Sequence, residues 1–232
     1  ASDYSTQVLL ADTIAEIAHE APGFRFEVQP MHDTPIDALE RGYIDLLLTI
    51  DYAISTDHPS QILFEEDYVV LGWEGNPAMH QPMTRELYFE LGHVTARFGK
   101  ARVAAFEDWF MRRQKQQRRV EVVAPSFLSI GGLVMNSNRI ATVHRRMAEV
   151  FVRSLPLVMR EMPFSFPRIR EAIQWHLSNN NDAGLRWVVE KLGAMAQRTG
   201  AGGNVVPIGT IPREDSERER IEYAYRMNNK SL

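Results

Sequence analysis

Apolar residues in the first fifty positions follow first a helical and then a strand-like spacing. Between residues 8 and 18 they recur three or four positions apart, which predicts one helix ended by Pro22-Gly23. From Phe24 to Val28 apolar and charged residues alternate, which is the pattern of a half-buried strand. Residues 44–50 are almost all apolar, as in a strand buried on both faces. The sequence therefore predicts one helix followed by two strands, with a short helix near residues 35–41 between them.

The alternation of strand and helix patterns continues to about residue 197. Expected strands lie near residues 67–73, 93–97, 119–124, 139–143, 155–162 and 171–177. Expected helices lie near residues 102–113, 126–135, 145–152 and 182–197. Such alternation implies βαβ units and a mainly parallel sheet, and this much of it suits two lobes of similar build.

Both ends of the chain depart from this pattern. Residues 1–5 resemble the end of a strand and the cap of a helix without the strand itself, so we expect a piece of a longer protein or an incompletely ordered N-terminus. A glycine-rich breaker at residues 198–203 precedes a highly charged stretch. Residues 213–227 are expected either to form an exposed helix docked through Ile221 and Tyr225 or to stay loose.

The composition is that of an ordinary globular protein. With 232 residues, of which 44% are hydrophobic and 24% charged, the chain can bury a proper core as one large domain or two smaller lobes. The net charge of −4 and the lack of a concentrated basic face argue against direct nucleic-acid binding by this chain, because phosphate neutralisation needs clustered Lys and Arg. The one basic run, residues 112–119, is interpreted as a solvated helix end and turn.

Several kinds of chemistry are excluded or disfavoured. The absence of cysteine excludes disulfides, thiolate zinc sites and cysteine nucleophiles, and it is compatible with a reducing compartment. No apolar run approaches the roughly 18 residues that a transmembrane helix needs. The sequence has neither a Gly-x-Ser-x-Gly elbow nor a P-loop, and its histidines lack the close spacing of a metal site. We therefore expect no cofactor, no metal, no enzymatic activity and no membrane partner.

Three strand-to-helix joints carry the residues most suited to binding a small molecule. Residues 91–100 place His93 at the start of a strand and a turn of small residues behind it. Residues 125–127 and 138–143 form the other two joints. In open α/β sheets ligands bind beyond the carboxyl ends of the strands, so these joints are candidate parts of one site.

Together with Ala1-Ser2-Asp3 and Ile44-Asp45-Leu46, these joints resemble the effector-binding domain of LysR-type transcriptional regulators over about residues 1–197. The resemblance is closest to the branch of salicylate, chlorophenol and nodulation flavonoid regulators, which senses aromatic compounds. It implies an α/β fold of two Rossmann-like lobes joined by two crossover strands, similar to a periplasmic binding protein. The implied division is lobe one at residues 1–87 plus 168–197, lobe two at residues 88–167, and a C-terminal extension at residues 198–232.

The resemblance also implies a function. The chain is expected to be the regulatory domain of a cytoplasmic transcriptional activator that binds a small aromatic effector, phenolic or acidic, between its lobes. Promoter DNA would be bound by an N-terminal helix-turn-helix domain that this chain lacks, with RNA polymerase as a further contact and a homodimer or homotetramer as the assembly. An exported solute-binding protein with the same two-lobe fold is the main alternative, and an enzyme on this scaffold is a more distant one.

Effector contacts are expected in both lobes. Ser2, Asp3 and Ser5 lie at a predicted helix N-terminus, where free N–H groups favour a carboxylate or phenolate, although plain N-capping accounts for them as well. In the salicylate-sensing branch the histidine that matches His93 contacts the ligand, and the alternative is a histidine satisfied by the backbone. The remaining expected contacts are Thr95, Phe98, Ser126, Phe127, Ile130, Trp175 and His176.

Some of these residues have equally ordinary explanations. Ser126 stands where some aromatic sensors carry a histidine, which puts a salicylate specificity in doubt and leaves room for a different or larger ring. Phe127 and Ile130 would wall the site or simply pack in the core. Trp175 would stack on a ring ligand or pack between the lobes.

Overall fold

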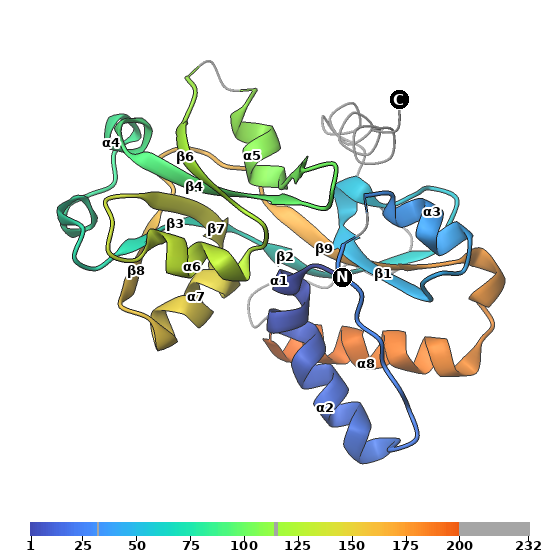
Figure 1. The fold of residues 1–232 in the computed structure, drawn as a ribbon. Coiled ribbons are helices and arrows are strands. Elements are labelled where there is room, and N and C mark those ends of the chain that lie inside the picture. Colours follow the sequence, from blue (N-terminus) through green and yellow to red (C-terminus); the bar gives the residue numbers. More distant parts are fainter. Residues whose placement is uncertain (32, 114–115, 200–232) are drawn as a thin grey trace. The chain divides into compact units, whose positions relative to one another are not determined.

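Two β-sheets organise the chain, and each belongs to one of two compact units (Figure 1). The computed structural model describes residues 1–31, 33–113 and 116–199. The first unit combines Ala1–Glu65 with the chain from Ile169 onward, and the second unit is Glu66–Arg168. The chain therefore passes between the units twice, which confirms the expected two-lobe α/β architecture.

The first unit is built on a three-stranded sheet whose central strand comes from the far end of the sequence. Its strands, in spatial order, are β1 (Leu46–Ile50), β9 (Ile169–Trp175) and β2 (Ser60–Glu66). β9 runs antiparallel to β1 and pairs Glu171 with Ile50 and Trp175 with Leu46. Six of the seven β9 residues are buried, as expected of a strand with a neighbour on each side.

Helices surround this sheet in the first unit. They are α1 (Asp3–Ser5), a π-turn (Thr6–Leu10), α2 (Ala11–Glu20), α3 (Pro35–Glu40), two 3-10 turns (Asp51–Ala53 and Leu177–Asn179) and α8 (Ala183–Thr199). α1, the π-turn and α2 form one helical stretch, because the residues at both junctions, Thr6 and Ala11, keep right-handed helical dihedrals. Leu10 and Ile17 on the predicted apolar face are buried. The first predicted helix is confirmed, and it begins earlier than the apolar spacing alone indicates.

The second unit contains a six-stranded mixed sheet. Its strands are β3 (Tyr68–Trp73), β4 (Gly92–Phe98), β5 (Val103–Ala104), β6 (Arg119–Ala124), β7 (Ile140–His144) and β8 (Leu157–Glu161). β4 runs parallel to β6 and β7, whereas β3 runs antiparallel to β7 and β8. The expectation of a mainly parallel sheet was wrong here, because β3 follows β2 directly and is not reached through a crossover helix.

Short helices connect the strands of the second unit. They are a 3-10 turn (Pro77–His80), α4 (Arg85–Glu90), α5 (Phe106–Met111), α6 (Leu128–Val134) and α7 (Arg145–Ser154). A buried cluster that includes Val70, Met79, Tyr88 and Ile140 joins the sheet to α4. Gly72 lies directly beneath Met79, and a Cβ atom there would overlap the methionine side chain. This close approach keeps the Met79 turn against β3.

The segment from Phe24 to Val28 is not a strand, contrary to the prediction. Phe24, Phe26 and Val28 are 42%, 38% and 44% exposed. No strand of the described chain pairs with the segment. Alternation shows which residues suit a sheet surface, but a strand forms only where a neighbouring backbone completes its hydrogen bonds.

The boundary between the units also differs from the expected one. Residues 66–87 were expected in lobe one, whereas β3 hydrogen-bonds to β7 and β8 and so belongs to the second unit. The expected features of residues 200–232 lie outside the described residues. Within the described part of the chain, no helix has both the length and the apolar character needed to cross a membrane.

Candidate functional site

A short chain of hydrogen bonds links the N-terminus of α1 to the central strand of the first unit. Ser2 caps the helix, since its Oγ accepts the Ser5 N–H at 3.0 Å. Ser5 Oγ donates to Glu171 Oε1 at 2.5 Å and lies 2.8 Å from Ser2 Oγ. Because the Ser5 proton is directed to the carboxylate, Ser2 must donate to Ser5. Ser5 and Glu171 are almost completely buried and Ser2 is half-buried, so the chain leads from the protein interior toward solvent.

The same end of the sheet carries an ion pair. Asp51 follows β1, and its Oδ2 lies 2.7 Å from Arg170 Nη2 and 2.8 Å from Arg170 Nε. Glu171 pairs with Ile50, the last residue of β1, so two buried carboxylates and one guanidinium gather at the carboxyl end of this strand. A ligand carboxylate is electrostatically disfavoured beside this excess of negative charge, whereas a hydroxyl that donates a hydrogen bond is favoured.

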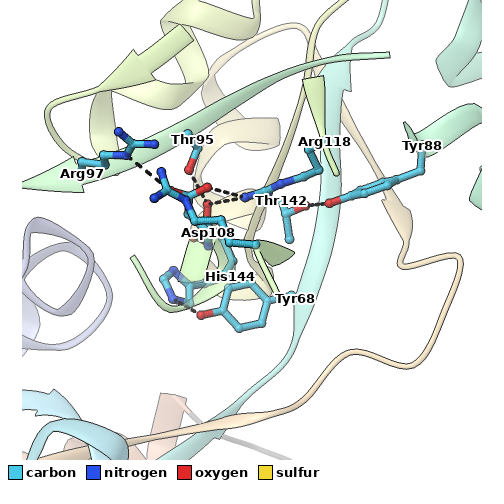
Figure 2. Close-up of polar contacts among 10 residues, drawn as sticks. Tyr68, Tyr88, Thr95, Arg97, Asp108, Arg118, Thr142 and His144 are labelled. Atoms are coloured by element: carbon cyan, nitrogen blue, oxygen red, sulfur yellow. Dashed lines mark hydrogen bonds and ion pairs between the residues drawn. The ribbon is translucent and has the colours of Figure 1, made fainter. Parts of the chain in front are cut away.

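Aromatic rings gather at the corresponding strand ends of the second unit. Phe98 ends β4, Phe127 follows β6, and His144 ends β7. The Phe127 ring lies 4.8 Å from both the Phe98 and the His144 rings, measured between centroids. Tyr68, which pairs with His144 in the sheet, places its hydroxyl 3.2 Å from His144 Nε2 (Figure 2). We call Tyr68, Phe98, Phe127 and His144 the Phe127 cluster.

Ser126 stands beside the Phe127 cluster and caps the next helix. Its Oγ accepts the Ser129 N–H at 3.3 Å and lies 2.7 Å from Ser129 Oγ. The side chain is half-buried, which leaves its oxygen open to a further partner. Ile130, one turn further, is 1% exposed and packs in the core.

A buried charge network lies deeper in the second unit (Figure 2). Arg118 Nη2 donates to Asp108 Oδ1 at 3.0 Å, and Thr95 Oγ1 donates to Glu107 Oε1 at 2.9 Å. Arg97 also reaches Asp108, at 3.4 Å. Burial raises the pKa of Glu107 to about 7, although the Arg118 charge opposes that rise. Three arginines including Arg112 converge on Asp108, so its carboxylate charge is neutralised inside the protein.

A family comparison identifies the domain. The model of a family described as the LysR substrate binding domain matches residues 1–197. The chain belongs to the LysR substrate-binding domain family. That range includes both units and ends within α8, so the family accounts for every element described above.

Curated relatives of this LysR domain are nodulation proteins. Nodulation protein D 1 of Rhizobium tropici is 37% identical over 187 residues, which cover 81% of this chain and 61% of that protein. Nodulation protein D of Bradyrhizobium sp. is also 37% identical over 187 residues, covering 81% of this chain and 55% of that protein. The chain thus spans about three fifths or less of the length of these relatives.

Solved structures support the same fold. The regulatory domain of MexT, a transcriptional activator in Pseudomonas aeruginosa, superimposes with a TM-score of 0.70 at 21% identity, covering 84% of this chain and 96% of that one. The regulatory domain of MetR, a LysR family regulator from N. meningitidis, gives a TM-score of 0.63 at 13% identity, covering 85% and 92%. At these identities the likeness concerns the fold, which is the two-lobe fold of LysR regulatory domains.

In this LysR domain the expected contact residues lie in several places. Ser2, Asp3 and Ser5 lie together at the carboxyl end of β1, and Phe98, Ser126 and Phe127 lie together at the strand ends of the second unit. Trp175 and His176 lie elsewhere, since Trp175 pairs with Leu46 at the opposite end of the β1–β9 ladder from Glu171. Trp175 Nε1 donates to Asn180 Oδ1 at 3.2 Å, and the His176 ring lies 4.8 Å from the His58 ring.

His93 and Thr95 are buried inside the second unit. Both side chains are 0% exposed, and His93 Nε2 lies 2.7 Å from the Tyr88 carbonyl oxygen. Burial, with a further contribution from the Arg118 charge, lowers the His93 pKa to about 3, so the neutral ring donates to that carbonyl. This arrangement favours the alternative of a histidine satisfied by the backbone. A direct effector contact at His93 or Thr95 stays a prediction.

Several residues of these clusters could not be predicted from sequence patterns. Glu171, Asp51 and His144 act through contacts with residues far away in the chain, and no local spacing marks them. Arg118 belongs to the basic run interpreted as solvated, but it is only 9% exposed, so that interpretation was wrong for this residue. A usable signal was the acidic pair Glu107-Asp108 between Phe106 and Trp109, because acids within an aromatic helix are seldom buried without a cation.

Proposed function

We propose that this LysR domain senses a small aromatic compound for a longer, cytoplasmic transcriptional activator. The observation that carries the proposal is the Ser2–Ser5–Glu171 hydrogen-bond chain, which ends in a half-buried hydroxyl at the carboxyl end of a strand. In the longer protein, polypeptide outside this chain would bind promoter DNA and the protein would act as a homodimer or homotetramer, with RNA polymerase as a further contact.

The hydrogen bonds favour a phenolic effector over an aromatic acid. The Ser5 proton is committed to Glu171 and the Ser2 proton to Ser5, so Ser2 offers a ligand only lone pairs. The nearby carboxylates of Asp51 and Glu171 add negative potential. A phenol donates its proton to such an acceptor, whereas a carboxylate brings a second charge of the same sign.

The second unit has, in the Phe127 cluster, an aromatic surface of its own on which an aromatic ring would pack. Phe98 is half-buried at the edge of this cluster, and Phe127 lies behind it. A ring packed edge-to-face or offset against one of them gains about 0.5–1.5 kcal/mol beyond its buried area. Binding regulates only through the difference in affinity between two conformations of the regulator, so an effector must favour one of them.

Calorimetric titration tests this proposal. Chlorinated phenols, flavonoids and hydroxybenzoates are titrated into the wild-type protein, the Ser2→Ala variant and Phe98→Ala. We expect saturable binding of a neutral phenol that each substitution weakens by about tenfold, the cost of one lost hydrogen bond or aromatic contact. Ser178→Ala is the matched control, because this exposed serine bonds, within the described chain, to its neighbours His176 and Asn179.

Two results would count against the proposal. Binding of hydroxybenzoates but not of neutral phenols would overturn the assignment of a phenolic effector. Chemical conversion of the bound compound, detected by product analysis, would favour the enzyme alternative instead. The other alternative, an exported solute-binding protein, is not favoured by any observation, since the matching family and the solved relatives are regulatory domains.

A further inference from the structure

A polar pocket lies at the amino ends of β4 and β6 in the second unit. It has a volume of about 290 Å³. Its glycine and polar lining consists of Glu90, Gly92, Arg119, Glu121, Asn138 and Arg139. Four of these residues carry a charge, two of each sign, and all four are at least partly exposed. We call this feature the amino-end pocket.

The amino-end pocket is separate from the Phe127 cluster. Phe98 ends β4 and Phe127 follows β6, whereas the pocket residues Gly92 and Arg119 begin the same two strands. The two sites therefore occupy opposite ends of β4 and β6, and a substitution in one leaves the side chains of the other in place.

Two features of the backbone bring the Glu121 carboxylate into the amino-end pocket. His93 and Val94, which are consecutive in β4, pair with two β6 residues that flank Glu121. Glu121 is thus an extra residue, as in a β-bulge, and bulges often redirect a side chain beside a functional site. Gly92 provides the room, since a Cβ atom there would overlap the Glu121 carboxylate.

Two arginines bracket the Glu121 carboxylate, one beside each oxygen. Arg119 Nη2 lies 3.3 Å from Oε1, and Arg139 Nη1 lies 3.8 Å from Oε2. Charge-assisted hydrogen bonds between such groups are normally about 2.7–2.9 Å long, so both pairs are loose. Arg139 is oriented by its Nε, which donates to the Leu133 carbonyl oxygen at 3.3 Å. Within the described chain, both guanidiniums therefore keep N–H groups for a further acceptor, and Glu121 keeps lone pairs for a further donor.

Stability alone does not account for this arrangement. Exposed ion pairs contribute little to the stability of a protein. A bulged strand also loses regular pairing at the extra residue. The register shift at Glu121 and the glycine beneath it are explained better by a ligand that uses the carboxylate.

We propose that the amino-end pocket binds a free α-amino acid in its zwitterionic form. The ligand carboxylate binds the guanidiniums of Arg119 and Arg139, and the ligand ammonium group binds the carboxylates of Glu121 and Glu90. Charges of both signs in one pocket favour this class, because a simple anion meets two carboxylates and a simple cation meets two guanidiniums. Pockets for drug-sized ligands measure roughly 300–1,000 Å³, so this smaller one suits a molecule of amino-acid size. The proposal does not depend on the aromatic effector.

Nuclear magnetic resonance titration of the 232-residue chain tests the proposal. Free L-amino acids are compared with their N-acetyl and C-terminal amide derivatives, each of which lacks one of the two charges. We expect at least one free amino acid to shift the amide resonances of Gly92, Glu121 and Arg139 saturably, with a Kd of about 1 mM or below. Removal of either charge should weaken binding by at least about tenfold, the loss expected for one charge-assisted hydrogen bond.

Substitutions in the pocket separate binding from folding. Arg119→Gln and Glu121→Gln each remove one charge from an exposed side chain, so both variants should fold and bind at least about tenfold more weakly. Arg153→Gln is the matched control, because that arginine is 76% exposed and pairs with Glu149 on α7, outside the pocket. Its affinity for the amino acid should equal that of the wild type. Phe98→Ala, which tests the aromatic effector, should also leave amino-acid binding unchanged.

Three outcomes would overturn the inference. The first is a lack of saturable binding by any common amino acid below about 10 mM. The second is equal binding of the N-acetyl or amide derivatives, which would show that only one charge is recognised. The third is binding that both Arg119→Gln and Glu121→Gln leave unchanged, which would locate the ligand elsewhere.

Discussion

The two buried polar clusters of this domain differ in where their hydrogen bonds lead. In the second unit, the buried Asp108 carboxylate is paired with three arginines, of which Arg118 is buried and Arg112 is half exposed. In the first unit, the chain from Glu171 through Ser5 ends at Ser2, which is half-buried. A carboxylate neutralised within the core contributes to stability, whereas one relayed to a partly open hydroxyl is suited to a ligand. The difference teaches that neutralisation by paired charges, and not burial alone, distinguishes a structural polar cluster from one suited to a ligand.

The largest effect that tests this comparison is expected at Arg118. Arg118→Met removes the most buried cation beside Asp108 and Glu107, and we expect a loss of about 3–5 kcal/mol in the free energy of unfolding, because a buried charge loses its partner. Urea unfolding measures the loss. Arg119→Met is the control, since that side chain is 64% exposed and should change stability by less than about 0.5 kcal/mol. Equal effects of the two substitutions would refute a structural role for the network.

A smaller loss is expected at Ser5. Ser5→Ala removes one hydrogen bond from a buried carboxylate and should cost about 1–3 kcal/mol in the free energy of unfolding. It should also weaken effector binding, because Ser2 then loses its acceptor. Arg118→Met, by contrast, should leave the affinity of the folded protein unchanged. A binding loss at Arg118 as large as that at Ser5 would erase the distinction between the clusters.

The pH dependence of stability sharpens the comparison further. Glu107 has a pKa raised from 4.5 to about 7, so the folded state holds its proton and this group's stabilisation is lost as the pH rises from 4.5 toward 7. His93 and His144 have pKa values lowered from 6.5 to about 3, mainly by burial, so their contribution is lost as the pH falls through that window. Between pH 5 and 6 the two histidines together affect stability more than Glu107 does. The free energy of unfolding should therefore rise with pH in this range.

Glu107→Gln is the variant that isolates the acid. Without the Glu107 carboxyl, whose titration opposes that of the histidines, the free energy of unfolding should rise more steeply between pH 5 and 6. The slope should increase by about 1.4 kcal/mol per pH unit, which corresponds to one proton bound. Urea unfolding at the two pH values gives the slope. An unchanged slope would mean that Glu107 is ionised in the folded protein.

The smallest effect is expected at Ser126, which caps the helix that follows β6. Ser126→Ala removes the acceptor of the Ser129 N–H and should cost about 0.5–2 kcal/mol in thermal unfolding. If Ser126 acts only as a cap, effector affinity will not change. A loss of affinity together with this small loss of stability would add Ser126 to the binding surface.

Much of the fold follows from local patterns, and the site follows only in part. Apolar spacing is sufficient for the first helix and for β1, β4 and β7, because each buries a face that its own residues define. The segment Phe24–Val28 fails that rule, since a strand also needs a partner that no local pattern supplies. Ser5 and Glu171 are 166 positions apart, so their hydrogen bond could not be read from spacing. Arg118 was misjudged because a run of charges does not show which member turns inward.

The π-turn Thr6–Leu10 determines how α1 is rotated relative to α2 around their common helix axis. A π-helical turn contains about one residue more than an α-helical turn, and one residue corresponds to about 100° of rotation around the axis. Deleting a single residue there would restore an unbroken α-helix. α2 is anchored by Ile17 and would keep its place, while Ser5 would swing around the axis, away from Glu171. The orientation of the Ser5 hydroxyl thus depends on the number of residues between Thr6 and Leu10, and not on which side chains they carry.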